Sequence, residues 1–321
     1  MERLEHPLPD AAAWIRFFAE RADKVPILRH TKRRLEELRP AAETLNAHVL
    51  SQVVLQDPLL TLRLMVTLQK RRPPDLRTRE LTTIDRILLM LGIRAFYAEC
   101  DRMALVEEEL ADLPDELTML LRLIARLRRA ARFAREWALL RRDIEVSEVV
   151  VAALLHDITE VLMWLYAPRL MSLLIRLRRT YPAIPLEQLQ RKVFNATEVE
   201  IRNGLIDALE LPEILKKLLD DHLLENPRTR TVWLATRLAR HLAHGWNDPR
   251  IPADLDAIQE LVHVNREILL KQLGAPEEAM ARLLGPAGET TPPTQTSGEA
   301  AAAVSADASK PSGPDAPSGG E

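Results

Sequence analysis

The chain has 321 residues, long enough for two ordinary domains or for one large helical domain with additions. Its 44 basic and 47 acidic side chains leave a net charge of −3, so we expect no overall attraction to nucleic acid or to an anionic membrane. Cys100 is the only cysteine, which excludes an internal disulfide and a cluster of thiolate metal ligands and suits a reducing cytoplasm.

Glycine is scarce in the body of the chain and concentrated near its end. Of ten glycines, six lie beyond residue 284, which leaves four for residues 1–284. So few glycines cannot supply the positive φ angles that repeated hairpin turns need. Leucine, alanine, arginine and glutamate dominate the same part of the chain, and they are strong helix formers. We therefore predict an all-α fold in the form of a multi-helix bundle.

No segment has the pattern of a signal peptide or of a membrane span. The N-terminus, MERLEHPLPD, lacks a basic start followed by an apolar block. We also find no run of the roughly 18–20 apolar residues that a span requires. We expect a soluble cytoplasmic protein that does not associate with a membrane.

Capping residues mark the helices predicted in the first third of the chain. The first helix carries an apolar stripe after Asp10: Trp14, Phe17 and Phe18. Another helix is predicted to begin at Asp57-Pro58, because the aspartate can accept backbone N–H bonds and proline needs no donor there. The apolar residues of "TTIDRILLMLG" (82–92) recur at helical spacing, and Gly92 is expected to close that helix in the left-handed conformation.

The middle of the chain predicts a long helix over about 115–140, followed by a helix that Ser147 caps and that ends before Pro168. The second of these carries His156 and Asp157. Further helices are predicted at about 168–180, 185–195, 198–209, 212–224, 229–245 and 254–273. A capping box of Thr197 and Glu200 is expected to begin the helix near 198.

A histidine next to an aspartate on an apolar helix, as in "AALLHDITEVLMW" (152–164), often marks a metal site. Neighbouring helical residues point about 100° apart, so the imidazole can bind one metal ion while the carboxylate reaches a second. A hydrolytic metal centre needs three or more protein ligands, however, so the rest of the chain must supply the others.

Several stretches occur in the order and spacing of the HDOD family, which is related to the HD-domain metal phosphohydrolases. "LLHDI" is preceded by "DPLLTLRLM" (57–65) and "TIDRILLMLG" (83–92), while "VPIL" (25–28) and "LELPEILKKLLDDH" (209–222) resemble the opening and a late helix pair of the family. The resemblance implies an all-α domain used in bacterial signalling, as an output or scaffolding module without metal-dependent hydrolysis. It covers an HDOD-like domain at 25–245, with an N-terminal helix at 1–24 before it and a C-terminal helical extension at 246–284 after it. Beyond residue 284 the chain is dominated by Pro, Gly, Ser, Thr and Ala, which predicts a disordered tail at 285–321.

The resemblance also implies where further metal ligands would lie, and they are missing. Catalytic HD proteins take a histidine from an upstream helix, but no histidine lies between His48 and His156, and the helix at 121–137 carries arginines instead. The position of the closing aspartate holds Arg240. Arginine stays protonated and repels a metal cation. We therefore predict no metal, no cofactor and no catalytic residue, with His156 and Asp157 as a vestigial pair.

A buried Asp157 would need donors, and an arginine from a facing helix is the natural one. We hypothesise that an arginine has replaced the metal as the cation of the pocket. The candidates are Arg240 and the arginines of 126–132.

A dense basic run predicts a face that could bind an acidic partner: Arg126, Arg128, Arg129, Arg132 and Arg135. Aromatic residues that would stack on bases are few, so we do not expect nucleic acid as the partner. The alternative is a solvated face that pairs with the acidic run at 106–116. His241 and His244 have a spacing that can bind metal, but interhelical or solvated roles are favoured.

The preferred function is a non-enzymatic signalling or regulatory module that acts through a protein partner, whose identity the sequence leaves open. The alternatives are a metal-dependent phosphohydrolase or phosphodiesterase, and a nucleotide- or nucleic-acid-binding regulator that uses the basic run at 122–142. The pathway, the input signal and the oligomeric state are open as well.

Overall fold

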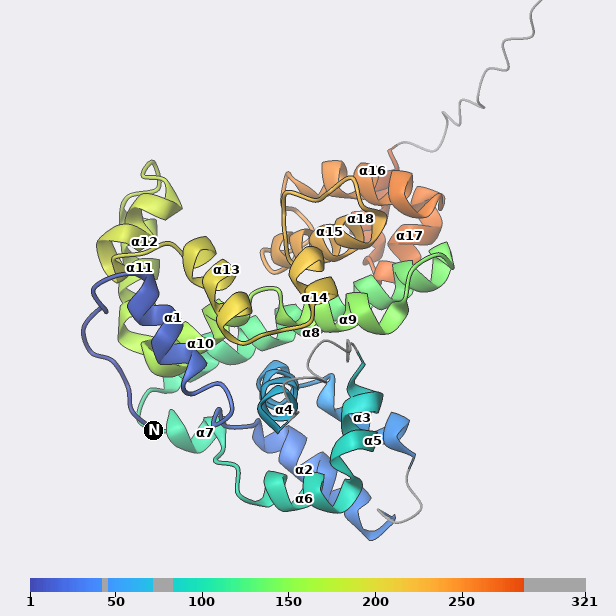
Figure 1. Ribbon diagram of the computed structural model, residues 1–321. Helices are drawn as coiled ribbons and strands as arrows, with labels where there is room; N and C mark the ends of the chain where they lie inside the picture. The colour runs from blue at the N-terminus through green and yellow to red at the C-terminus, as the bar shows by residue number, and fades with distance from the viewer. Residues whose placement is uncertain (42–45, 72–82, 286–321) are drawn as a thin grey trace, which may run out of the picture. The chain divides into compact units, whose positions relative to one another are not determined.

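The computed structural model describes residues 1–41, 46–71 and 83–285, and every regular element in those ranges is a helix (Figure 1). An isolated parallel bridge between Ile27 and Leu105 is the exception to helical pairing. The all-α prediction is confirmed. Residues Met1–Leu284 form one compact unit. Disorder was predicted for residues 285–321, and all of these except Gly285 lie outside the described residues.

Three groups of helices follow one another along the chain. Those before the long central helix are α1 (Ala11–Ala19), α2 (Arg29–Leu38), η1 (Arg39–Ala41), α3 (Ala47–Val54), α4 (Pro58–Arg71), α5 (Ile84–Leu91), α6 (Ile93–Asp101) and α7 (Val106–Glu109). The middle group is α8 (Pro114–Arg141), α9 (Val146–Leu155), α10 (Ile158–Tyr166), α11 (Pro168–Thr180), α12 (Leu186–Phe194), α13 (Glu198–Ala208), α14 (Glu213–Leu218) and α15 (Pro227–Leu242). The last is α16 (Ile251–Val262), α17 (Arg266–Leu273) and α18 (Glu277–Leu284).

The caps predicted at Asp10, Asp57 and Thr197 are confirmed, whereas the one predicted at Ser147 is not. Asp57 accepts hydrogen bonds from the N–H groups of Leu59 and Leu60, at 3.0 and 3.1 Å, and begins α4. Thr197 and Glu200 form the predicted capping box of α13. Gly92 ends α5 with φ 79° and ψ 142°, which is not the predicted left-handed helical conformation, because α6 begins at the next residue.

Three predicted helices differ from the structure. The one assigned to Ser147 begins at Val146, where Ser147 donates to Glu145 and does not cap, and it stops at Leu155. A turn at residues 156–157 separates it from α10. The helix predicted at 254–273 is two, because His263 adopts a left-handed conformation with φ 54°. The helix predicted at 212–224 ends at Leu218.

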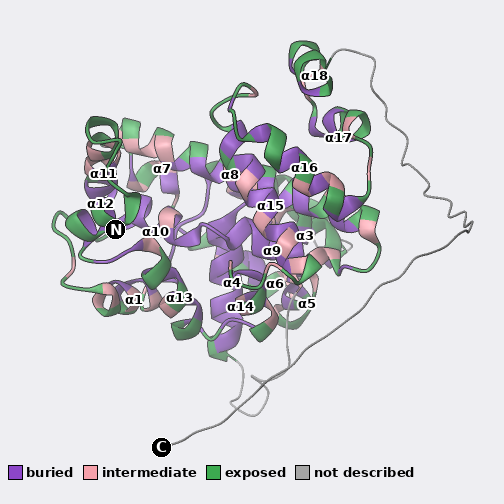
Figure 2. Ribbon diagram, turned by 90° about the horizontal axis from the view of Figure 1, so that it is seen from above, coloured by how far each residue is buried: buried purple, intermediate pink, exposed green. Residues whose placement is uncertain are grey.

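α8 is the central helix, and it packs against α9, α10 and α15. Its apolar residues recur every three or four positions, so they gather on the side that these helices cover. The buried ones are Leu120, Leu123, Ile124, Leu127, Ala130, Ala131, Phe133, Ala134, Trp137 and Ala138. Figure 2 shows the contrast between the buried centre, where α8, α9 and α15 meet, and the exposed outer helices. The site described below lies at this junction.

One segment, Val146–Tyr166, has the length and composition of a membrane span, with a mean hydropathy of 1.6, which the sequence analysis did not recognise. It comprises α9 and α10, and 94% of its apolar window is buried inside the protein. Burial against α8 and α15 accounts for its apolar character. No other described segment passes the same test of length and hydropathy.

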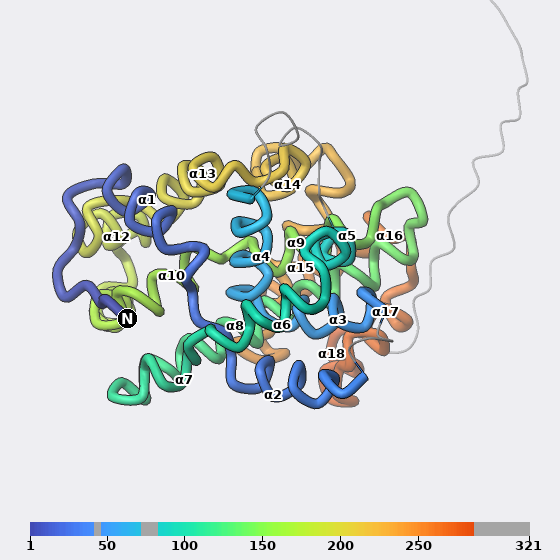
Figure 3. The backbone as a smooth tube through the Cα atoms, turned by 60° about the horizontal axis from the view of Figure 1, so that its bottom comes forward, coloured from blue at the N-terminus to red at the C-terminus, as the bar shows by residue number. Residues whose placement is uncertain are grey.

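The N-terminal helix α1 packs along α13, far away in sequence, and Figure 3 shows the two side by side. Trp14 is fully buried, and its indole N–H donates to the carbonyl of Phe194 at 2.7 Å. Gly204 of α13 makes the close approach possible, because a Cβ there would lie 2.2 Å from Cδ1 of Ile15. Residues 1–24 thus share the core of the compact unit.

Candidate functional site

His156 and Asp157 occupy the turn between α9 and α10, and both are buried, with 4% and 2% of their surface exposed. Asp157 is in the N-cap position of α10, but its side chain accepts no hydrogen bond from the first turn of that helix. Its two carboxylate oxygens are therefore available to other helices.

Two arginines from different helices bind the carboxylate of Asp157. Arg126 of α8 donates from Nη2 to Oδ2 at 2.8 Å, and Arg240 of α15 donates from Nη2 to Oδ1 at 3.1 Å. His156 Nδ1 lies 2.7 Å from Oδ1. Burial by itself raises the pKa of Asp157, but Arg240, His156 and Arg126 together hold it well below its usual range. The predicted pairing of Asp157 with arginine is confirmed.

The contacts continue from His156 to Asp221, in the segment after α14. His156 Nε2 lies 3.2 Å from Asp221 Oδ1, and Arg202 of α13 donates to Asp221 Oδ2 at 2.8 Å. Arg126 Nη2 also reaches Oε2 of Glu160 at 2.6 Å. We call this set the His156 network: Arg126, His156, Asp157, Glu160, Arg202, Asp221 and Arg240.

The network favours the protonated form of His156. Burial by itself lowers its pKa, but hydrogen bonds to Asp157 and Asp221 outweigh burial and raise it above the ordinary value. The pKa of Asp221 is depressed in turn, since His156 and Arg202 outweigh its own burial. A ring whose two nitrogens both face carboxylates donates through both only as the imidazolium.

These residues do not fit a metal centre. Both ring nitrogens of His156 lie within hydrogen-bond distance of carboxylates, and both oxygens of Asp157 are bound by guanidinium groups. Three arginines pair with the three carboxylates of Asp157, Glu160 and Asp221, so the negative charge that would attract a cation is already neutralised. Within residues 1–41, 46–71 and 83–285, no group of three or more His, Cys, Asp or Glu side chains could hold a metal ion.

Glu198, the first residue of α13, lies beside the network and was not recognised in the sequence. It is partly buried, and burial together with Glu160 and Asp157 raises its pKa to about 7. Its place directly after a capping threonine made it look like an ordinary helix-start carboxylate. Asp221 belongs to the late helix pair noted above, whereas nothing in the local pattern marks Arg202.

His222, His241 and His244 do not form a second site. His222 is exposed, and its backbone N–H donates to Asp220 at 3.0 Å. His241 is buried, with Nδ1 2.5 Å from Oδ2 of Asp254, which ties α15 to α16. His244 is exposed. The structure therefore does not bring His241 and His244 together, and His241 has the interhelical role that the sequence favoured.

The predicted basic face is divided between the interior and the surface. Arg126 enters the His156 network, and Arg128 is partly buried and donates from Nε to the carbonyl of Gln56. Both therefore face inward, which corrects the prediction for these two residues. The other three arginines are exposed: Arg129, Arg132 and Arg135.

The acidic run at 106–116 does not neutralise the arginines of α8 among the ion pairs of the described residues. Glu109 pairs with the terminal amino group of Met1 at 2.7 Å, and Asp112 with Arg3 at 2.8 Å. The run thus contacts the N-terminal segment. The pairing that the alternative assumed is not found among these ion pairs, whereas the solvated character of the three exposed arginines agrees with it.

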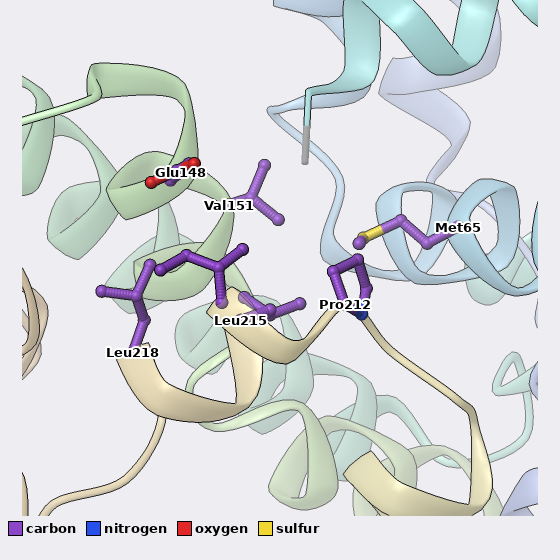
Figure 4. Close-up of a pocket in the computed structure, with 7 residues that line it drawn as sticks. Met65, Glu148, Val151, Pro212, Leu215 and Leu218 are labelled. Atoms are coloured by element: carbon purple, nitrogen blue, oxygen red, sulfur yellow. The ribbon is translucent and has the colours of Figure 1, made fainter. Parts of the chain in front are cut away.

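A small apolar pocket lies on another side of α9 (Figure 4). Met65 of α4 and Pro212, before α14, face Val151 of α9. The other lining residues are Glu148, Ile214, Leu215 and Leu218, of which Glu148 alone is charged. No member of the His156 network lines this pocket. Its lining offers packing surface and no convergent set of polar groups.

Comparison with known proteins gives the same family as the sequence motifs. The family model of the HDOD domain matches residues 25–223. A solved structure of the MmoQ response regulator from Methylococcus capsulatus is similar in fold, with a TM-score of 0.52, 20% identity, and coverage of 82% of this chain and 99% of that one. A virulence factor from Campylobacter jejuni has a TM-score of 0.58, 16% identity, and coverage of 83% and 95%. A search of curated proteins finds no match.

Proposed function

The chain belongs to the HDOD domain family, and from this we propose that it is a cytoplasmic signalling or regulatory module that works by binding a protein partner. The name of the similar MmoQ structure, a response regulator, supports a place in bacterial signalling. In this proposal the His156 network has a structural role, and the protein does not hydrolyse phosphoesters.

The observation that carries the proposal is the pair of arginines on Asp157. In a metal-dependent hydrolase the cation at this carboxylate is exchangeable and polarises water. Here the cations are covalent parts of α8 and α15, at 2.8 and 3.1 Å from the carboxylate. A guanidinium group cannot activate water in the same way, because it offers no open coordination position. What the arginines supply instead is a fixed connection between three helices.

Metal analysis of the purified full chain tests the non-enzymatic part. We expect metal content well below one equivalent, and the same content in the Asp157→Asn variant. Two equivalents of tightly held iron or manganese that disappear in Asp157→Asn would overturn the proposal. An assay with a generic phosphodiester, run with added manganese, should give equal rates for both proteins.

The partner-binding part needs a separate experiment. Affinity capture with the full chain from bacterial cytoplasm should recover one partner reproducibly and in defined stoichiometry. If the full chain instead retains labelled nucleic acid, with binding that falls steeply as salt rises, the nucleic-acid alternative replaces the proposal.

A further inference from the structure

We propose that one exposed ridge of α8 is the docking surface for an acidic amphipathic helix of the partner, an inference that rests on the proposed function. The α8 ridge is Leu121, Arg122, Ala125, Arg129, Arg132 and Leu139. After the first pair, these residues follow one another at intervals of three, four or seven along the helix, and the last interval spans Glu136, which lies on the same side and pairs with Arg132. Such spacing places them on one side of an α-helix.

The ridge is open to solvent while the opposite side of α8 forms the core. All six of its residues are exposed, and Leu121 and Leu139 have 37% and 55% of their surface accessible. Residues between them, such as Leu123 and Phe133, are almost fully buried. The ridge is therefore an outward face of a helix that the core holds rigidly, so a partner would meet a preformed surface.

The charge of the α8 ridge has little internal compensation. Arg122 and Arg129 form no ion pair with any described residue; Arg132 forms one long ion pair, with Glu136 at 3.8 Å, and its guanidinium lies 5.3 Å from the centroid of the Phe133 ring. The nearest acidic run in sequence, at 106–116, is engaged with Met1 and Arg3 instead. In a chain of net charge −3, this leaves a local positive surface that attracts an acidic partner.

The spacing of the arginines indicates how long the partner helix is. Arg122 and Arg132 are ten positions apart, which corresponds to about 15 Å along the helix axis at roughly 1.5 Å per residue. Carboxylates three or four residues apart on a helix of about three turns match that length. The exposed leucines near the two ends of the ridge offer apolar contacts for the same helix.

The leucines favour a protein partner over nucleic acid. A surface that binds phosphates needs positive charge and hydrogen-bond donors, and one that binds single strands also uses aromatic side chains. The α8 ridge has no aromatic residue and places Leu121 and Leu139 beyond its arginines. Apolar side chains exposed beside positive charge complement an amphipathic acidic helix.

The test uses a synthetic helical peptide of about three turns, with glutamates on one side flanked by leucines, and a scrambled peptide of the same composition. The full chain should bind the ordered peptide at least tenfold more tightly than the scrambled one. The triple variant R122E/R129E/R132E should lose at least tenfold in affinity, and Leu139→Ser several-fold. Because these side chains are exposed, the circular dichroism and the unfolding midpoint of each variant should match the wild type.

A matched control reverses three exposed arginines of α11, in R176E/R178E/R179E, which changes the net charge by the same amount. That control should bind the ordered peptide as the wild type does, within twofold. Equal losses in both triple variants, equal binding of the two peptides, or absence of peptide binding would overturn the proposal. So would tighter binding of a DNA duplex than of the peptide, with the same α8 variant abolishing it.

The affinity capture described above separates this inference from the proposed function. If R122E/R129E/R132E still captures the partner that the wild type captures, the α8 ridge is not the docking surface but the proposed function stands. If the wild-type chain captures no partner, the proposed function fails whatever the peptide shows.

Discussion

Arg240 of α15 donates from Nη2 to both carboxylate oxygens of Asp157, at 3.1 and 3.3 Å. Arg126 of α8 reaches the same carboxylate at 2.8 Å, so Asp157 joins the turn between α9 and α10 to two further helices. Metal ligands drawn from several helices connect them through a bound ion. In this protein the connection is made by side chains alone, which makes its strength measurable by substitution.

Replacement of Asp157 by alanine is expected to lower the free energy of unfolding by about 3–5 kcal/mol, because removal of one partner of a buried ion pair leaves the other charges without compensation. Arg126 has only 18% of its side chain exposed and would lose one of its two carboxylate partners, with Glu160 remaining. Arg240→Met should cost only about 1 kcal/mol, since Arg240 is 47% exposed and solvent screens its charge. Urea denaturation followed by circular dichroism measures both.

Asp143→Ala provides the control, because that aspartate pairs with Arg141 at the surface, with 55% of its side chain exposed. Its effect should be much smaller than that of Asp157→Ala, because solvent screens an exposed ion pair. Similar losses for Asp143→Ala and Asp157→Ala would show that burial of the network contributes nothing to stability.

The pKa of Glu198 makes stability depend on pH in an unusual direction. Burial, together with Glu160 and Asp157, raises its pKa to about 7, although Arg240 and Arg202 oppose the shift. Between about pH 4.5 and 7, Glu198 is protonated in the folded state and ionised in the unfolded state. The free energy of unfolding therefore falls as pH rises through this range. Glu198→Gln should be more stable than the wild type at pH 8, with the difference shrinking toward pH 5.

Glu200, two residues further along the same helix, is the matched control for Glu198. Its pKa is lowered by the N–H of Thr197 and by Arg191, so its contribution is present above its unfolded pKa and lost as pH falls. Glu200→Gln should therefore give no gain at pH 8. The measurement is the thermal unfolding midpoint of both variants at pH 5 and pH 8. A higher midpoint at pH 8 in both variants would contradict the prediction that the raised pKa of Glu198 in particular destabilises the folded state.

Asp57 is expected to matter more than an ordinary helix cap. It is fully buried and accepts N–H groups from Leu59 and Leu60 in its own helix and from Leu28 at 2.9 Å. Asp57→Ala leaves three buried donors without an acceptor, so it should lower the free energy of unfolding by more than about 3 kcal/mol. Asp10→Ala, which removes the exposed cap of α1, should cost only about 1 kcal/mol. Chemical denaturation measures the free energy of unfolding of both variants. Equal losses would contradict the idea that Asp57 stabilises the protein by joining α4 to the backbone of Leu28.

Helix starts were predictable where a local cap marks them, as at Asp57 and Thr197. The interruptions at 156–157 and at His263 were not, because apolar periodicity runs through both and tertiary contacts determine where the helix breaks. Such breaks depend on contacts between residues far apart in sequence, which a local sequence pattern does not contain.

The site was predictable to a similar extent. The pairing of Asp157 with arginine followed from the charge that a buried carboxylate requires and from the arginines at the positions of the missing ligands. The contact between Arg202 and Asp221 joins α13 to the segment after α14, across a turn whose geometry depends on packing. No local sequence motif predicts such a pair.

Gly204 provides a test of how α1 is attached to the rest of the protein. A Cβ at Gly204 would lie 2.2 Å from Cδ1 of Ile15 and 3.1 Å from its Cγ1, closer than side chains normally approach. Alanine is favoured over glycine within a helix by about 1 kcal/mol, so the contact and the helix preference oppose each other. Because overpacking costs about 1–3 kcal/mol, Gly204→Ala should be destabilising on balance.

The double variant Ile15→Val with Gly204→Ala separates the two effects. Valine lacks Cδ1, the atom at 2.2 Å, so most of the clash is relieved and the helix preference for alanine is recovered. In the Ile15→Val background, Gly204→Ala should therefore be neutral or stabilising, with a coupling of about 1–2 kcal/mol between the two sites in urea denaturation. If Gly204→Ala costs the same in both backgrounds, the close approach of α1 to α13 is not what requires glycine at this position.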